Sequence, residues 1–261
     1  MTAVASTRPL FARLLRTLDV TTVCDVGSMD GADAQIFRRQ LPHANILAFE
    51  PNPRNFALMR QDERLRANRI QVLPFAASDE EAEAPFFVVK LVAGENDRFR
   101  RGMSSLHRRA DPSLLADVVP VRAVRLDRLL TGERMADDAL AFWIDAEGKA
   151  YEVISGTAGV LGNTRMLHVE VETTPCIGAE QRLFPDVCRY LEQAGFHLLA
   201  TDRPVEYVQF NALFVRADLV RDRAVPIRAW LVLAWLRRST TRVVLACIPM
   251  RVRKRYGLWL Y

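Results

Sequence analysis

Two short segments of the chain constrain its fold more than any other feature. Val23–Gly31 has the sequence VCDVGSMDG, and Ile46–Pro53 has the sequence ILAFEPNP. Their apolar and polar patterns predict a buried strand, a glycine-containing turn, a helix and a second strand that ends on the carboxylate of Glu50. This carboxylate lies about 20 residues after the glycine turn, where it can accept hydrogen bonds from both hydroxyls of a ribose. The two segments therefore predict a nucleoside-binding βαβ unit, with its ligand beyond the carboxyl ends of parallel strands.

The turn indicates which nucleoside binds. It contains Gly27 and Gly31 but lacks the G-x-G-x-x-G spacing that lets the backbone approach a pyrophosphate. Asp25, near the end of the first strand, would repel a diphosphate and attract an ammonium group. S-adenosylmethionine carries an ammonium group and a ribose diol but no phosphate, so it fits this turn better than NAD does.

Strand and helix patterns alternate along the rest of the chain, which predicts a doubly wound α/β fold with a mainly parallel sheet. An amphipathic helix within residues 1–20 is expected to cover one edge of this sheet. Residues 84–89 and 118–126 flank a long polar segment that we predict to be a substrate-facing lid. The other predicted strands cover residues 22–26, 45–49, 70–75, 140–144, 166–171, 196–200 and 208–215, and the other predicted helices cover 32–40, 53–62, 149–161 and 179–194.

Five segments together resemble the FkbM-type methyltransferases, over roughly residues 20 to 217. They are CDVGSMDG, AFEPNP, GMSSL at Gly102–Leu106, VRAVRLDRLL, and FWIDAEGKAYEVISG at Phe142–Gly156. The chain departs from the family pattern at Ser28–Asp30, where Ala-Asn is usual. The resemblance implies a Rossmann-like class I methyltransferase sheet whose last strand, at 208–215, is antiparallel. It also implies transfer of a methyl group from S-adenosylmethionine, most often to a hydroxyl of a sugar or natural product.

Cofactor-binding candidates come from the three loops that follow the first three strands. Small residues after the third strand are expected where an adenine would lie. The candidates are Asp25, Gly27, Ser28, Gly31, Glu50, Asn52, Ala76 and Ser78.

Asp145 and Glu147 are the leading candidates for catalysis, because they follow a buried central strand whose end should face the ligand crevice. Methyl transfer to a hydroxyl requires a base to remove the proton. Asp145 could alternatively cap the next helix. His168 and His107 compete for the role of base, and the sequence does not rank them.

Further polar residues are expected near the acceptor. Ser104, Ser105 and His107 lie on the long polar segment, and Glu170 shares a strand face with His168. As an alternative to acid–base chemistry, Glu170 and Glu172 could join Asp145 and Glu147 around a Mg²⁺ ion. No residue is assigned as a metal ligand.

The last part of the chain differs from the rest in charge. Residues 221–261 carry a net charge of +9, whereas residues 1–220, the predicted methyltransferase domain, carry −4. Basic and Trp-rich helices within 224–261 could lie on an anionic membrane, or could pack on the domain or on a second subunit of a homodimer. Because the basic charge is confined to this tail, nucleic-acid binding is not expected. The four scattered cysteines and the absence of a secretion signal favour a cytoplasmic, peripherally membrane-associated protein.

The sequence is compatible with three functions. The favoured one is an S-adenosylmethionine-dependent O-methyltransferase that acts on a sugar, glycolipid or glycosylated natural product. A NAD-linked oxidoreductase or epimerase would require the missing glycine spacing. The third alternative is a non-catalytic scaffold that retains the cofactor fold and is recruited to membranes by its tail. Such a scaffold would not require the acids at 25, 50, 145 and 147, so their presence weighs against it.

Overall fold

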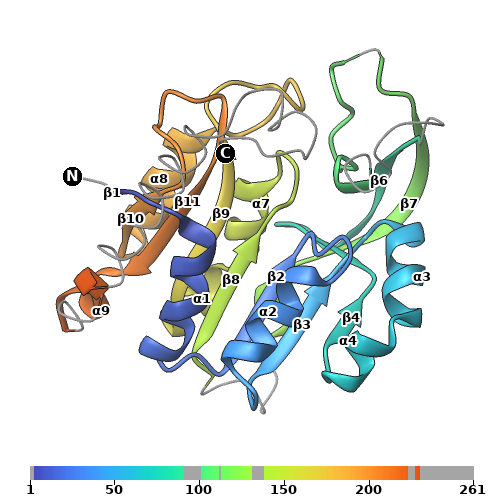
Figure 1. Ribbon diagram of the computed structural model, residues 1–261. Coiled ribbons are helices and arrows are strands. Elements are labelled where there is room, and N and C mark those ends of the chain that lie inside the picture. Colours follow the sequence, from blue (N-terminus) through green and yellow to red (C-terminus); the bar gives the residue numbers. More distant parts are fainter. Residues whose placement is uncertain (1–2, 91–100, 112, 131–137, 223–226, 230–261) are drawn as a thin grey trace, which may run out of the picture.

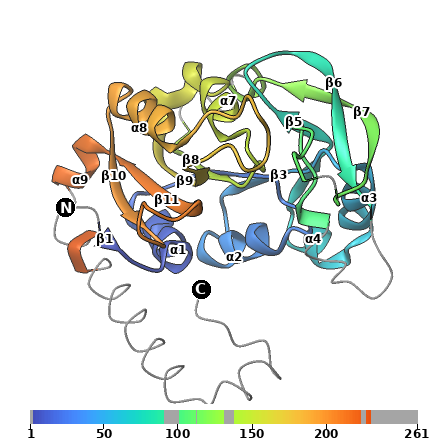
Figure 2. The same cartoon turned by 90° about the horizontal axis from the view of Figure 1, so that it is seen from above.

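The computed structural model describes residues 3–90, 101–111, 113–130, 138–222 and 227–229. Its main sheet has eight strands in the order β1-β10-β11-β9-β8-β2-β3-β4, with helices on both faces (Figure 1, Figure 2). This arrangement confirms the predicted α/β class I methyltransferase fold. The strands are β1 (Ala3–Val4), β2 (Thr22–Val26), β3 (Asn45–Phe49), β4 (Gln71–Leu73), β8 (Leu140–Ile144), β9 (Thr164–Glu172), β10 (Phe196–Thr201) and β11 (Gln209–Arg216).

The centre of the sheet is parallel and completely covered. Every residue of β2 and β8 is buried, as expected for strands with helices on both faces. β2 pairs in parallel with both β3 and β8, and β8 pairs in parallel with β9. The carboxyl ends of these four strands therefore meet at one edge of the sheet.

Helices form a layer on each face of the main sheet, visible from above in Figure 2. One layer packs around Phe11, Phe37 and Met59, and the other packs around Val153, Ile154 and Leu191. The first layer contains α1 (Thr7–Thr17), α2 (Ala32–Gln40), α3 (Pro53–Gln61) and α4 (Glu63–Ala67), and the second contains α7 (Ala150–Ser155) and α8 (Phe184–Gln193).

The predicted antiparallel closing strand is confirmed. β11 lies between β9 and β10 and is antiparallel to both. Gly195, which follows α8, has a φ of +85° and allows the chain to reverse into β10.

A second, three-stranded sheet was not predicted. Pro74 has no N–H to donate and separates the predicted strand 70–75 into β4 of the main sheet and the first strand of the smaller one. This smaller sheet, in the order β5-β7-β6, stands beside the carboxyl ends of β3 and β4 (Figure 1). Its strands are β5 (Phe75–Ala77), β6 (Ala82–Val89) and β7 (Ala116–Val124), and the short α6 (Leu126–Leu129) follows.

Three helix predictions need correction. The helix predicted at 149–161 is α7 followed by a 3₁₀ helix, η1 (Ala158–Asn163), and the helix predicted at 179–194 begins only at Phe184. Between α7 and η1, Gly156 packs so closely on the backbone of Ser78 that a Cβ would lie 1.9 Å from its carbonyl oxygen. The N-terminal helix α1 covers a face of the sheet over β9 and β11, whereas the edge strand is β1.

The basic tail lies largely outside the described residues, which stop at 229 and omit 223–226. The predicted domain boundary at residue 220 falls inside the short helix α9 (Ala217–Asp222), and Ile227 is buried in the main core. In the described part of the chain, no helix is long and apolar enough to span a bilayer. The interfacial helices predicted within 224–261 stay a prediction.

We expect Phe11 to be a main anchor of α1. Its ring is fully buried and makes edge-on contacts with Phe37 and Trp143 at centroid distances of 5.3 and 5.4 Å. Phe11→Ala should lower the free energy of unfolding by about 3–5 kcal/mol, because it leaves a cavity. Urea denaturation measures the change, with the half-exposed Leu58→Ala as the matched control. Equal effects of the two substitutions would show that α1 contributes no core packing.

Candidate active site

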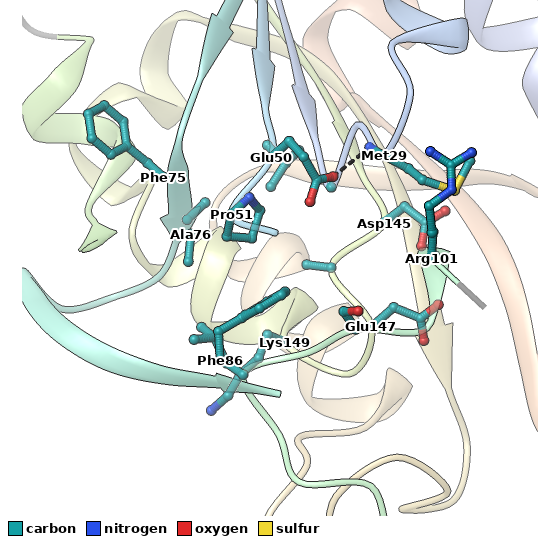
Figure 3. Close-up of a pocket in the computed structure, with 17 residues that line it drawn as sticks. Met29, Glu50, Pro51, Phe75, Ala76, Phe86, Arg101, Asp145, Glu147 and Lys149 are labelled. Atoms are coloured by element: carbon teal, nitrogen blue, oxygen red, sulfur yellow. Dashed lines mark hydrogen bonds between the residues drawn. The ribbon is translucent and has the colours of Figure 1, made fainter. Parts of the chain in front are cut away.

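A cavity opens where the carboxyl ends of β2, β3 and β8 meet the smaller sheet. Figure 3 shows its two sides: Phe75, Ala76 and Phe86 line one, and Asp145 and Glu147 line the other. An apolar side and an acidic side in one cavity suit a ligand with an aromatic base at one end and a polar reacting group at the other.

Gly27 brings the first turn into contact with the loop after β8. It has a φ of +80°, and a Cβ at this position would lie 1.8 Å from the carbonyl oxygen of Asp145. The backbone N–H of Asp145 also donates to the carbonyl of Val26 over 2.9 Å. Only glycine fits this turn, and the two loops therefore form one continuous part of the cavity wall.

Glu50 is held at the end of β3 by two backbone donors. Met29 donates its N–H to Oε2 over 2.6 Å, and Asn52 donates its N–H to Oε1 over 2.8 Å (Figure 3). Burial raises the pKa of Glu50 to about 7, although both N–H groups oppose the rise. Each carboxylate oxygen keeps capacity for a further hydrogen bond, so the group can accept from a diol.

The apolar side of the cavity comes mainly from the smaller sheet. Pro51 follows Glu50, while Phe75, Ala76 and Phe86 come from β5 and β6. Leu106, from the segment 101–111, completes this side. Together these side chains can enclose an adenine by stacking and apolar contact.

The acidic side carries the carboxyl groups of Asp145 and Glu147, and a third carboxyl group, that of Glu170, lies next to them. Oxygens of Asp145, Glu147 and Glu170 lie within 4.8 Å of one another. Burial is the main cause that raises the pKa of Asp145, and burial together with the charges of Asp145 and Glu147 raises that of Glu170 well above the ordinary value. Because α7 begins at Ala150 with Lys149 at the N-cap position, Asp145 does not cap this helix.

Glu147 is paired with a cation. Arg109 forms an ion pair with its carboxylate, and Ser105 donates its hydroxyl to the Glu147 carbonyl over 2.7 Å. Burial raises the pKa of Glu147 to about 8, and the Arg109 charge opposes this rise. Among the described residues Asp145 forms no ion pair, and it lines the cavity directly after the end of β8.

Several predicted cofactor residues lie behind the cavity wall. Asp25 is buried and accepts a 2.6 Å hydrogen bond from the Ser28 hydroxyl, and burial raises the pKa of Asp25 to about 8. Gly31, at a φ of +72°, begins α2 against Leu65. Neither Asp25 nor Ser28 is among the residues that line this cavity, and the ammonium contact predicted for Asp25 stays a prediction.

Two further predictions for the cofactor site concern the second and third loops. Asn52 caps α3 by accepting from the N–H of Arg54, and its Nδ2 lies 3.3 Å from the hydroxyl of Ser104, which does line the cavity. Ala76 lines the apolar side, whereas Ser78 packs against Gly156 behind it.

Neither His168 nor His107 lines this cavity. His168 is buried away from the cavity, stacks on Trp143 at 3.6 Å and has Nε2 3.0 Å from the Thr7 hydroxyl. Burial lowers its pKa well below the ordinary value. The imidazole of His107 packs against Gly178, outside the cavity wall. Both histidines pack against neighbouring residues outside the cavity wall, and their candidacy as base stays a prediction that this geometry does not favour.

Sequence reasoning missed most of the wall. Met29, Phe86, Arg101 and Lys149 all line the cavity, but their roles depend on the smaller sheet and on the turn geometry. Met29 has a φ of +53°, which no pattern in the sequence indicates. The quoted motifs were the available signals: Met29 lies in CDVGSMDG, Lys149 lies in FWIDAEGKAYEVISG, and Arg101 directly precedes GMSSL.

Comparison with known proteins gives two sequence matches. The family model described as the methyltransferase FkbM domain matches residues 25–198, more than half of the chain. The 2-O-methyltransferase NoeI of Sinorhizobium fredii (strain NBRC 101917 / NGR234) is 26% identical over 155 residues, which are 57% of this chain and 62% of that protein. The chain thus spans about three fifths of the length of this relative.

Solved structures give distant matches. A precorrin-6y C5,15-methyltransferase from Geobacter metallireducens GS-15 is 13% identical at a TM-score of 0.41, covering 80% of this chain and 87% of that one. A magnesium protoporphyrin IX methyltransferase from Synechocystis PCC 6803, with S-adenosylhomocysteine bound, is 11% identical at 0.41, covering 80% and 81%. Likeness this distant supports no conclusion about function.

The family match covers both sides of the cavity wall, from the turn after β2 to Asp145 and Glu147 after β8. The chain belongs to the FkbM-domain methyltransferase family.

Proposed function

We propose that the protein transfers a methyl group to a hydroxyl oxygen of a sugar, in a glycan, glycolipid or glycosylated natural product. The observation that carries this proposal is the Asp145 carboxylate in the cavity wall, which forms no ion pair among the described residues and is hydrogen-bonded to a second carboxyl group, that of Glu170. A hydroxyl acceptor requires a base, and this pair can provide one. Similarity to a 2-O-methyltransferase over 155 residues supports a sugar acceptor.

The cavity fits S-adenosylmethionine, which when bound supplies an activated methyl group. Glu50 would accept hydrogen bonds from the ribose diol, because two backbone donors already orient its carboxylate. Phe75, Phe86 and Leu106 would enclose the adenine. Arg101 and the turn at Gly27 would face the polar end.

In this proposal Asp145 removes the proton of the acceptor hydroxyl. Its neighbour Glu170 holds a proton and donates it in a hydrogen bond to Asp145, because two anionic carboxylates at this spacing repel each other. Arg109 favours the ionised form of Glu147, against burial, which raises the pKa of Glu147 to about 8. The NAD-linked alternative does not agree with the family match, and the intact carboxylates oppose a non-catalytic scaffold.

Glu50→Ala should weaken binding of S-adenosylhomocysteine by about 1–3 kcal/mol, the cost of losing hydrogen bonds to a charged group. Calorimetric titration of wild type and variant measures it. Glu83→Ala, an exposed acid on β6, is the matched control and should bind as wild type does. Equal affinities for the Glu50 variant and wild type would refute the ribose assignment.

Cofactor affinity should also depend on pH through Glu50. Its pKa is raised to about 7, so the carboxylate is ionised above that pH and becomes neutral below it. We expect S-adenosylhomocysteine to bind more weakly as pH falls from about 8.5 to about 5.5, since a neutral carboxyl group accepts weaker hydrogen bonds. Glu50→Gln has no such titration and should flatten the profile near neutral pH. The same slope in both proteins would remove Glu50 as the cause.

Asp145→Asn should reduce turnover by about 10²-fold or more, as expected for loss of a positioned base, with S-adenosylhomocysteine affinity within a few fold. Turnover is measured with labelled S-adenosylmethionine and cell-envelope extract as the acceptor source. Asp117→Asn, an exposed acid paired with Lys90, is the control. Normal turnover by the Asp145 variant would exclude it as the base.

Chelation tests the alternative in which the same carboxylates hold Mg²⁺. EDTA should leave the activity unchanged if a shared proton relieves the repulsion between Asp145 and Glu170. Loss of activity with EDTA and its recovery with Mg²⁺ would instead show that the reaction needs a cation there.

A further inference from the structure

Segment 101–111 connects otherwise separate parts of the cavity wall. On one side, Asn55 donates its side-chain amide to the carbonyl of Arg101 over 3.3 Å, and Asn52 lies 3.3 Å from the Ser104 hydroxyl. In the middle, Ser105 exchanges backbone hydrogen bonds of 2.8 and 3.2 Å with Phe87 of β6. The segment is thereby fixed both to the turn after Glu50 and to the smaller sheet.

The same segment is also fixed to the loop after β8, through Glu147. The Ser105 hydroxyl donates to the Glu147 carbonyl, and Arg109 pairs with the Glu147 carboxylate. Arg109 donates a second hydrogen bond, from Nε to the carbonyl of Met103, over 2.7 Å. The side chains of Arg109 and Glu147 are only 13% and 18% exposed, so solvent screens their attraction little.

Glu147 has an unfavourable backbone conformation that requires such support. Its φ is +45°, in the left-handed region that side chains other than glycine rarely adopt. Such a conformation persists only where the surroundings impose it. Here the surroundings are Ser105, which holds the carbonyl, and Arg109, which holds the carboxylate.

The position of Glu147 affects Asp145, which lies two residues earlier. The carbonyl of Asp145 lies against Gly27, and its N–H donates a hydrogen bond to the carbonyl of Val26. The loop that contains Asp145 can therefore shift only if the turn at Gly27 also moves. A displacement of about 1 Å at a reacting group can reduce the rate about 10²-fold.

We propose that Arg109 is a positioning residue: together with Ser105 it holds the Asp145–Glu147 loop in register with the cofactor cavity without touching either substrate. This proposal rests on the proposed methyl transfer to a hydroxyl and extends it to a residue that lies outside the cavity wall. Arg109 acts through Glu147, and its contribution therefore depends on the Glu147 carboxylate.

A double-mutant cycle tests this dependence. Arg109→Met and Glu147→Gln should each lower kcat about 10- to 100-fold, while the Kd for S-adenosylhomocysteine stays within about threefold. Because both substitutions break the same pair, the double variant should be no slower than the slower single variant. Arg108→Met is the matched control, since this neighbouring arginine is exposed and should leave kcat unchanged.

Several results would overturn the proposal. If the losses of kcat caused by Arg109→Met and Glu147→Gln multiply in the double variant, Arg109 acts independently of Glu147, for example on an anionic acceptor. A loss of cofactor affinity equal to the loss of kcat would make Arg109 only a structural support of the wall. A kcat like that of Arg108→Met would show that Arg109 has no role.

Two variants remain useful if Arg109→Met does not fold. Arg109→Lys keeps the positive charge, but a single ammonium group should not reach the Met103 carbonyl and the Glu147 carboxylate at the same time. We therefore expect kcat to fall in this variant as well. Ser105→Ala removes the second anchor of Glu147 and should lower kcat several-fold. Wild-type kcat in both variants would refute the proposal.

Hydrogen exchange separates this inference from the proposed function. Amides at 145–148 should exchange faster in Arg109→Met or Arg109→Lys than in Arg108→Met, whether or not an acceptor has been found. Unchanged exchange would overturn the positioning role. If wild type transfers no methyl group to oxygen but exchange at 145–148 responds as expected, the proposed reaction fails and the role of Arg109 in holding this loop stands.

Discussion

The parallel pairing of β2 with β3 and with β8 is the constraint on which the site depends. It brings Gly27, Glu50 and Asp145, which are far apart in sequence, to one edge of the sheet. The contact between Gly27 and the Asp145 carbonyl then sets the distance between the turn after β2 and the loop after β8. A side chain at position 27 would separate two loops that the hydrogen bond from Asp145 to Val26 holds together.

Buried charge divides the cavity into two chemical regions. In one region, Glu50 accepts hydrogen bonds from the backbone N–H groups of Met29 and Asn52 and lies beside the apolar side of the cavity. At the other, the carboxyl groups of Asp145 and Glu170 have raised pKa values because they are buried close together. Burial of acids is unfavourable unless they are paired, protonated or bound to a ligand, so their concentration here indicates selection for chemistry rather than stability.

The sequence was sufficient for the parts of the fold that depend on local pattern. Apolar runs ending at Val26, Phe49 and Ile144 predicted the central strands. The acids that follow two of these runs, Glu50 and Asp145, were predicted as site residues, and both line the cavity. The smaller sheet was missed because Pro74 splits one apolar run between two sheets, and this depends on tertiary pairing. The alternation of polar residues along β9 did not show that α1 covers His168 while Glu170 lies near Asp145 and Glu147. The Arg109–Glu147 pair joins residues 38 positions apart, so no local pattern indicated it.

The most direct test of the account is to locate the transferred methyl group. The protein would be incubated with methyl-labelled S-adenosylmethionine and glycan-containing extract, and the labelled product isolated and examined by NMR. The account predicts a label on a sugar oxygen, as an O-methyl ether, that is lost with Asp145→Asn. A label on nitrogen or carbon would contradict it, because neither the base at Asp145 nor the sugar acceptor would then be required.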